Sequence, residues 1–242
     1  MSERSLDLTK FKNLKELQIV SRRQAPSLSI NLNTHTIESL RVVPGIEIAN
    51  LTVDRFPKLK LLHAHLDDKV LSYISSARTL ETIQIHSTNE NVEFLCSSNM
   101  SHLKSVSLIF TPLGKAPWER CTTSHETVHS LNVHINNPNN QNESKNLGDF
   151  FKFAFTYMPN IKSLTIREGL SGNTQNLTNI IKSFTHLNFL EIGTPNDSII
   201  TSIEQAAIIS GWSFLRSNPP SSSGSRTVKI LIKNTPHWIV IP

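Results

Sequence analysis

A degenerate pattern of three apolar residues recurs eight times along the chain, spaced as apolar-x-x-apolar-x-apolar. Its starts lie at residues 14, 37, 59, 80, 103, 128, 161 and 187, so successive starts are 21 to 33 residues apart. A repeat of this length is typical of a solenoid, in which each unit buries its apolar face only against its neighbours. The triplets are Leu14-Leu17-Ile19, Ile37-Leu40-Val42, Leu59-Leu62-Ala64, Leu80-Ile83-Ile85, Leu103-Val106-Leu108, Val128-Leu131-Val133, Ile161-Leu164-Ile166 and Leu187-Leu190-Ile192.

The end of each triplet alternates apolar and polar residues, which is the period of a strand with one buried face. Several units also carry an apolar residue three positions before the triplet, which we call the anchor. These anchors are Phe11, Phe56, Met100, Met158 and Phe184. A two-layer domain with evenly spaced strands would explain the strands alone. The joint recurrence of anchor and strand favours the solenoid.

The triplet and its anchor resemble the leucine-rich repeat family over roughly residues 6–195. The resemblance implies an α/β fold, a leucine-rich-repeat-like solenoid with a concave parallel sheet and a mixed helix/irregular convex side. The family's asparagine, expected three residues after the last apolar strand position, is kept in a single unit. Those positions hold Arg22, Gly45, Asp67, Thr88, Thr111, Asn136, Gly169 and Pro195. The chain is therefore closer to the irregular intracellular repeats of F-box proteins.

We expect residues 1–197 to form the solenoid of about eight units and residues 198–242 to form a C-terminal cap, with a flexible Pro/Ser spacer at 217–225. Within the cap, Ser198–Arg216 is predicted to be a helix, followed by strands at Val228–Ile232 and Trp238–Ile241. At the N-terminus no comparable cap is expected.

Two convex helices and one loop are also predicted. Asp67 precedes a helix with one apolar face. Residues 148–157 are expected to form a helix carrying four phenylalanines, which either packs between repeats or exposes a docking patch; we favour packing. The polar tract at 136–146 accounts for most of the longest step and is predicted to be a mobile loop.

If the strands are parallel, equivalent side chains line up about 4.8 Å apart between adjacent units. The resulting concave face is polar and nearly neutral, and it lacks the aromatic anchors of a tight interface. It is the predicted partner-binding surface. Its residues are Gln18, Arg41, His63, His65, Gln84, His86, Ser107, Asn132, His134, Thr165, Arg167 and Glu191.

Three histidines on this face, His63, His65 and His86, are expected on the same side of the third and fourth strands. They could titrate together and make binding depend on pH, or hold a transition metal. The simplest interpretation is that they are ordinary solvent-facing residues, since no carboxylate or cysteine completes a ligand set beside them. We therefore assign no metal site.

The sequence predicts no enzyme, no catalytic residues and no cofactor, because no nucleophile motif or glycine-rich phosphate loop occurs. Only two cysteines, Cys96 and Cys121, are present, and no apolar run suits a signal peptide or a membrane span. These features predict an intracellular protein, cytoplasmic or nuclear. The basic residues near the N-terminus are interrupted by Asp7 and Glu16, which argues against nucleic acid.

The expected function is a non-enzymatic protein–protein interaction scaffold or recognition module. The resemblance suggests one concrete version, substrate recognition in an F-box-like ubiquitin ligase, although no F-box fits before Leu14. The alternatives are a pH- or metal-responsive binding protein that uses the histidine cluster, and a nucleic-acid-associated protein that uses the basic N-terminal end. The partner's identity and the oligomeric state stay open.

Overall fold

A computed structural model describes residues 4–8, 10–20, 28–31, 34–42, 51–88, 95, 101–111, 121–135, 150–167, 186–194, 201, 204, 205, 208, 213–217 and 226–231. The elements are β1 (Arg4–Asp7), β2 (Glu16–Ile19), β3 (Leu28–Asn31), the 3-10 helix η1 (Thr34–Thr36), β4 (Ser39–Val42), β5 (Leu61–His65), α1 (Asp68–Ser76), β6 (Thr82–Thr88), β7 (Ser105–Thr111), β8 (Ser130–Ile135), β9 (Ser163–Arg167), β10 (Phe189–Thr194), β11 (Ser213–Ser217) and β12 (Arg226–Leu231). Residues 150–157 are also helical.

The main sheet follows the chain from one unit to the next. Strands β2, β4, β5, β6, β7, β8, β9 and β10 lie side by side in that order, and every neighbouring pair is parallel. Beyond β10 the sheet continues with the antiparallel strands β12 and β11. β1 and β3 form a separate two-stranded parallel sheet. The fold is thus α/β with an open sheet of eight parallel strands and few helices.

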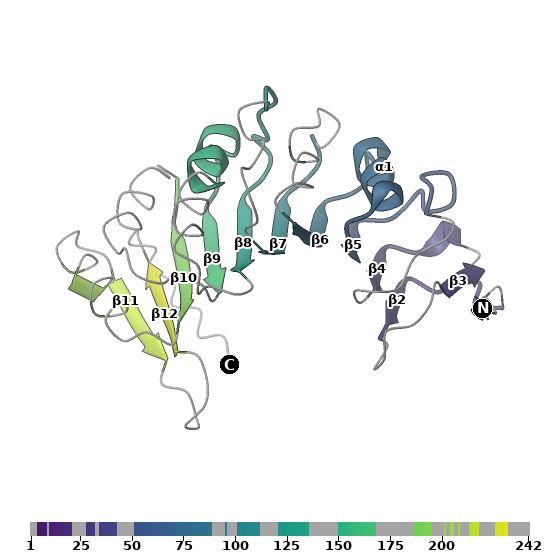
Figure 1. The fold of residues 1–242 in the computed structure, drawn as a ribbon, viewed down its shortest axis with the longest axis horizontal. Coiled ribbons are helices and arrows are strands. Elements are labelled where there is room, and N and C mark those ends of the chain that lie inside the picture. Colours follow the sequence, from purple (N-terminus) through teal and green to yellow (C-terminus); the bar gives the residue numbers. More distant parts are fainter. Residues whose placement is uncertain are drawn as a thin grey trace.

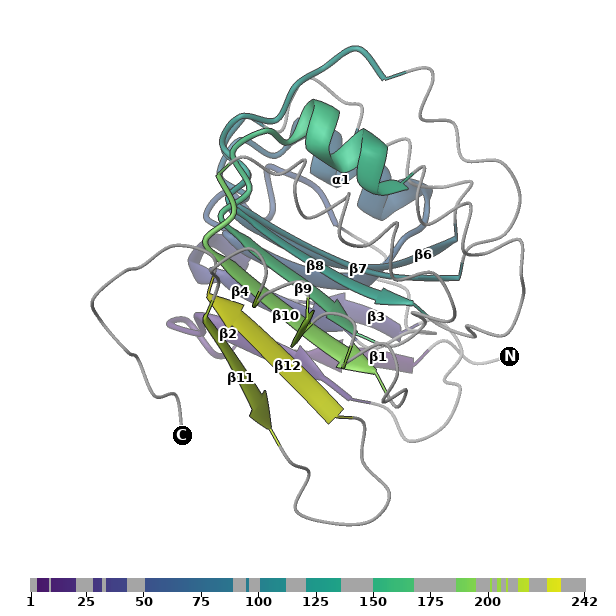
Figure 2. The ribbon, with the colours of Figure 1, turned by 90° about the vertical axis from the view of Figure 1, so that its left-hand side faces the viewer.

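The sheet curves, and its two faces differ. Figure 1 shows the strands along the inner side of an arch, with α1 and the helix at 150–157 on the outer side. Figure 2 shows both helices on the same side of the sheet. The predicted concave parallel sheet with a partly helical convex side therefore agrees with the observed layers.

The apolar triplets form the core. Their side chains are buried in every unit except at Leu14 and Leu17, which are partly buried. Both belong to the first unit: Leu17 lies on the edge strand β2 and Leu14 just before it, where no preceding strand of this sheet covers them. Strand pairing aligns Leu40, Leu62 and Ile83 as direct partners, so like residues stack on like residues.

The anchors mark the turn before each strand. Phe56 and Met158 are buried, and each backbone carbonyl accepts a hydrogen bond from the first residue of the following triplet. Phe11 makes the same turn, but 57% of it is exposed, at the same end of the sheet as β2. His125 occupies the anchor position of the sixth unit; it is buried and its Nε2–H donates to the carbonyl of Leu95. A polar residue thus fills an apolar position because a hydrogen bond satisfies its ring.

Just before each strand, one backbone carbonyl joins consecutive units. The carbonyl of Lys15 accepts hydrogen bonds from the amides of Glu38 and Ser39, at 2.8 and 3.0 Å. The same two-donor arrangement recurs at all later junctions up to β10. We call the residues that carry it the edge column. It consists of Lys15, Glu38, Lys60, Glu81, Lys104, His129, Lys162 and Asn188.

Threonine hydroxyls add a second link between units. Thr36, Thr79 and Thr127 each stand one residue before a triplet. Each hydroxyl donates to the carbonyl of the first triplet residue of the preceding unit, at 2.8 to 3.0 Å. Side-chain bonds of this kind satisfy carbonyls that the strand ladder leaves unpaired.

The two helices form for local reasons. The Asp67 side chain accepts a hydrogen bond from the amide of Val70 and caps α1, as its position predicted. Inside α1, the buried Tyr73 donates from its hydroxyl to the carbonyl of Phe56, and its ring meets that of Phe56 edge-on. α1 is thereby held to the turn of its own unit.

The aromatic helix at 150–157 packs between units, as favoured from the sequence. Phe150, Phe151 and Phe153 are buried, whereas Phe155 is 38% exposed. The hydroxyl of Tyr157 donates to the carbonyl of Cys121 at 2.6 Å. The helix therefore contributes to the core and offers no extended aromatic patch.

One predicted element is wrong. The helix expected over Ser198–Arg216 cannot reach its predicted end, because Ser213–Ser217 is strand β11, paired with β12. Pairing with β12 determines the conformation of this segment, although the spacing of its apolar residues is helical. The spacer predicted at 217–225 loses Ser217 to the same strand. The strand predicted from Val228 is present as β12, beginning at Arg226.

Several predictions fall outside the described residues. They are Met100, Phe184, the loop at 136–146, residues 218–225 and the strand at Trp238–Ile241.

Replacing Ile83 by alanine tests the stacked core. Ile83 is fully buried in β6, so we expect the free energy of unfolding to fall by about 2–5 kcal/mol. Urea unfolding followed by circular dichroism measures it. Gln84→Ala in the same strand is the control, since Gln84 lies on the concave face and its loss should change stability by about 0.5 kcal/mol or less. Equal losses for both variants would contradict the assigned faces.

Candidate functional site

The structure brings the predicted concave residues into register. One column, here the central column, joins Gln18, Arg41, His63, Gln84, Ser107, Asn132, Thr165 and Glu191 through consecutive strand pairs. A second, the distal column, joins His65, His86, Ile109, His134, Arg167 and Gly193. All twelve predicted side chains are partly or fully exposed. The site is thus a continuous surface across eight strands.

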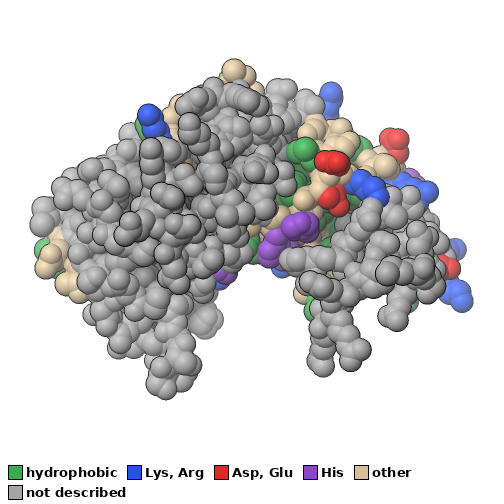
Figure 3. Space-filling model, in the orientation of Figure 1, with side chains coloured by type: hydrophobic (Ala, Val, Ile, Leu, Met, Phe, Trp, Pro, Cys, Tyr) green, Lys and Arg blue, Asp and Glu red, His purple; other side chains and the backbone are tan. Residues whose placement is uncertain are grey.

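Two of the three clustered histidines touch. The Nε2 atoms of His63 and His86 are 3.1 Å apart, although the two residues are not direct strand partners. The ring planes are within 9° of parallel and the ring centroids are 5.3 Å apart. Since the nitrogens are much closer than the centroids, the rings meet through their Nε2 edges. Figure 3 shows histidine side chains gathered in the hollow of the arch.

The environment of the His63–His86 contact disfavours protonation of both rings. Partial burial lowers the pKa of His63, and the guanidinium of Arg41 lowers it further. Burial also lowers the pKa of His86 to about 4, with smaller contributions from His63, His65 and His134. At neutral pH both rings are neutral, so one Nε2–H donates to the other Nε2.

His65 does not complete a metal site with this pair. It is exposed at the end of β5, beside His86 in the distal column. Within the described residues, no three histidine, cysteine, aspartate or glutamate side chains converge as a metal ion would require.

A second surface, which the sequence analysis missed, lies along the edge column. Its charges alternate over the first five units, from Lys15 through Glu38, Lys60 and Glu81 to Lys104. The carboxylate of Glu38 lies 3.7 Å from the Lys15 ammonium and 2.9 Å from that of Lys60. Glu81 and Lys104 are 2.9 Å apart. Comparing the first x of each apolar-x-x-apolar unit would have revealed this alternation.

The ion pairs shift the pKa values in the expected directions. A hydrogen bond from Lys60 lowers the pKa of Glu38, and the same bond raises the pKa of Lys60. A hydrogen bond from Lys104 lowers the pKa of Glu81. These groups are open to solvent, where such pairs contribute little to stability. Lys15, part of the proposed basic N-terminal end, is thus partly neutralised by Glu38.

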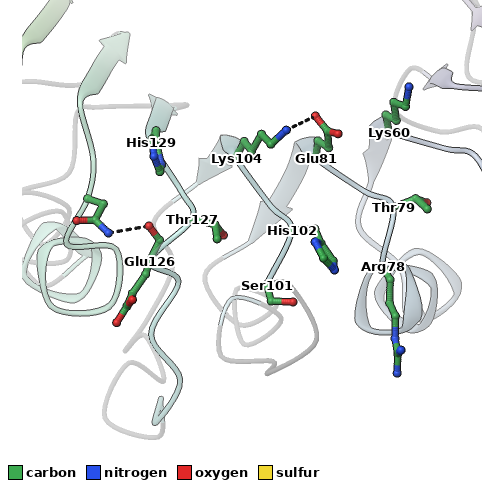
Figure 4. A pocket seen from close by; sticks show the side chains of 11 residues that line it. Lys60, Arg78, Thr79, Glu81, Ser101, His102, Lys104, Glu126, Thr127 and His129 are labelled. Atoms are coloured by element: carbon green, nitrogen blue, oxygen red, sulfur yellow. Dashed lines mark hydrogen bonds and ion pairs between the residues drawn. The ribbon is translucent and has the colours of Figure 1, made fainter.

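A shallow groove of about 740 Å³ runs beside this column. Figure 4 shows its side chains arising from the turns that lead into the strands, with Lys104 reaching toward Glu81. The groove carries both Arg78 and Glu126, so its charges are mixed. The amide of Asn160 donates to the Glu126 carbonyl at 2.8 Å, which ties one end of the groove together. Mixed charges at an open edge do not define a ligand.

Cys121 is buried and disulfide-bonded. The chain holds one other cysteine, Cys96, which lies outside the described residues. Disulfides are typical of oxidising compartments. The small number of cysteines is therefore not by itself an argument for the expected intracellular location.

Neither the protein families nor the curated proteins compared with this chain give a match. Among the described residues, no helix has the length and hydrophobicity needed to cross a lipid bilayer.

The free energy of unfolding should decrease as the pH is lowered, because three imidazoles are buried or partly buried in the folded state. The pKa values of His63, His86 and His125 are all lowered in the folded state, below an ordinary value of 6.5. Below that pH the unfolded chain binds more protons than the folded one. The free energy of unfolding is therefore highest above pH 6.5 and decreases toward pH 4, the folded pKa of His86.

Urea unfolding at pH 7.5 and pH 5.0 measures this decrease. In the double variant His63→Gln/His86→Gln the decrease should be smaller, with His125 accounting for part of the remainder. An unchanged decrease would show that the histidine pair does not contribute.

Proposed function

We propose that this chain is a leucine-rich-repeat-like recognition module that binds another protein on its concave face. The observation that carries the proposal is the register of the central and distal columns, which line up polar side chains across eight parallel strands. The described helices lie on the opposite side of the sheet (Figure 2), so they leave these side chains open to a partner.

The chemistry of this surface suits a protein partner. Between Arg41 and Arg167 it presents hydroxyl, amide and imidazole groups, including Ser107 and Asn132. Such groups exchange hydrogen bonds with water for hydrogen bonds with a partner at small net cost. The strand backbone fixes their positions, which reduces the ordering entropy that binding requires.

Two narrower versions of the proposal remain. In the first, the partner is a substrate of a ubiquitin ligase, as the resemblance to F-box repeats suggests; the disulfide at Cys121 fits this version poorly. In the second, binding responds to pH, which the contact between His63 and His86 favours. The expected cytoplasmic or nuclear location is part of the proposal for the first version.

Affinity capture of the tagged chain from its native extract, read by mass spectrometry, tests the proposal. We expect one protein at near-stoichiometric amounts. The variant Ser107→Arg/Asn132→Arg should reduce its capture at least roughly tenfold, because two bulky cations replace small polar groups at adjacent central positions.

The matched control places the same substitutions on the convex side, as Ser72→Arg on α1 and Thr156→Arg on the helix at 150–157. Both are exposed, and the control should capture normally. If only the convex variant loses the partner, the concave face is not the binding surface. Recovery of a Skp-type adaptor or a cullin would favour the ligase version.

A further inference from the structure

The concave face carries no acidic side chain at its described positions between β4 and β9. From β4 to β9, its described positions carry six side chains that are cationic or can become so. The carboxylates at the described concave positions of the neighbouring strands are Glu16 on β2 and Glu191 on β10. Glu191 lies 3.9 Å from the guanidinium of Arg167. The six side chains are Arg41, His63, His65, His86, His134 and Arg167.

The histidine pair at the middle of this surface can take one proton but not two. With both rings neutral, a single hydrogen lies between the facing Nε2 atoms. A proton added to the donor's Nδ1 leaves that hydrogen bond intact and makes it charge-assisted. A second added proton would place two N–H groups head to head at 3.1 Å, so the pair must separate.

The groups around the pair make even the first proton costly. On β4 the neighbour is the permanent cation Arg41, and on β5 it is His65. The other described concave residues of β6 and β7 are uncharged, and on β8 the neighbour is His134. No group among these can compensate a positive charge. An anion supplied from outside would do so.

We propose that the concave face over β4–β8 binds a carboxylate-rich segment of the partner protein, and that binding is coupled to uptake of a proton by the His63–His86 pair. The inference rests on the proposed function and names its partner chemistry and its regulation. Binding is weak when the pair is neutral and strengthens as the pH falls, since a bound carboxylate and the added proton stabilise each other.

An acidic protein segment suits this surface better than a nucleic acid. At the described concave positions from β4 to β9, the only permanent cations are Arg41 and Arg167, and Arg167 faces Glu191. Binding to a phosphate backbone relies on several cations in succession. Hydroxyl and amide groups such as those of Ser105 and Asn132 can donate hydrogen bonds to the oxygens of carboxylates and peptide carbonyls.

Fluorescence anisotropy with a labelled deca-aspartate peptide tests the proposal, at constant salt and at pH 7.5 and 5.5. Aspartate stays ionised over this range, so the peptide charge is nearly constant. We expect affinity to rise roughly tenfold at the lower pH, which is the gain expected from partial uptake of one proton over two pH units.

The variant His63→Gln/His86→Gln should remove most of this gain, since glutamine keeps a polar side chain but does not titrate. The matched control is His102→Gln/His129→Gln, which removes two exposed histidines from the groove beside the edge column and should keep the gain. Circular dichroism at both pH values confirms that each variant is folded.

Equal affinity of the natural chain at both pH values would overturn the proposal, as would a gain that persists in the His63→Gln/His86→Gln variant. A ten-nucleotide thymidylate strand that binds as tightly as deca-aspartate would also overturn it, in favour of unselective anion binding. If Ser107→Arg/Asn132→Arg abolishes partner capture but peptide binding ignores pH, this inference alone fails. If that variant captures the partner normally, the proposed function fails. The pH dependence of deca-aspartate binding then still shows whether this face binds carboxylates with uptake of a proton.

Discussion

The carbonyls of the edge column hold the units in register. From Lys15 to Lys162, each of these carbonyls accepts amide hydrogen bonds from two successive residues of the next unit, at the point where the strand begins. This contact fixes where each strand starts relative to its neighbour. Because side chains alternate between faces, a slip by one residue would turn the apolar triplet outward and the concave columns inward. The buried stacks such as Leu62 on Ile83 and the polar column through His63 and Gln84 therefore depend on the same bonds.

Fixed register explains why the convex side can vary. Once the strand is placed, a buried residue at the anchor position closes the turn before it in several units. Phe56, His125 and Met158 fill this position with different chemistry. His125 is accommodated because its ring is hydrogen-bonded to Leu95, and burial lowers its pKa so that it stays neutral. The segments that follow the strands range from the capped helix α1 to irregular turns without changing the sheet.

Side chains of adjacent units are similarly spaced in the edge column and on the concave face, but their charges interact differently in the two places. Along the edge column, neighbours of opposite sign form ion pairs, so the pKa of Glu81 falls and that of Lys60 rises. On the concave face, partial burial, with smaller contributions from the neighbouring imidazoles, lowers the pKa of His86 to about 4. Neighbouring side chains in register are close enough to interact, and their order along the chain decides the sign. The lowered pKa values of His63 and His86 therefore keep the positive charge of the concave face small unless an anion binds there.

The apolar triplets predicted the buried columns, because period-two alternation places every second side chain of a strand on the buried face. The resemblance that the triplets carry supplied the parallel order of the strands, and the two together predicted which twelve residues share the concave face. Sequence spacing could not predict that Ser213–Ser217 would leave its helical pattern for a strand, since the pairing partner β12 comes later in the chain. It could not predict which histidines touch: His63 meets His86 diagonally, whereas its direct strand partner is Gln84. Local pattern determines the face on which a side chain lies, and only the packed sheet determines which neighbour it reaches and whether water still surrounds it.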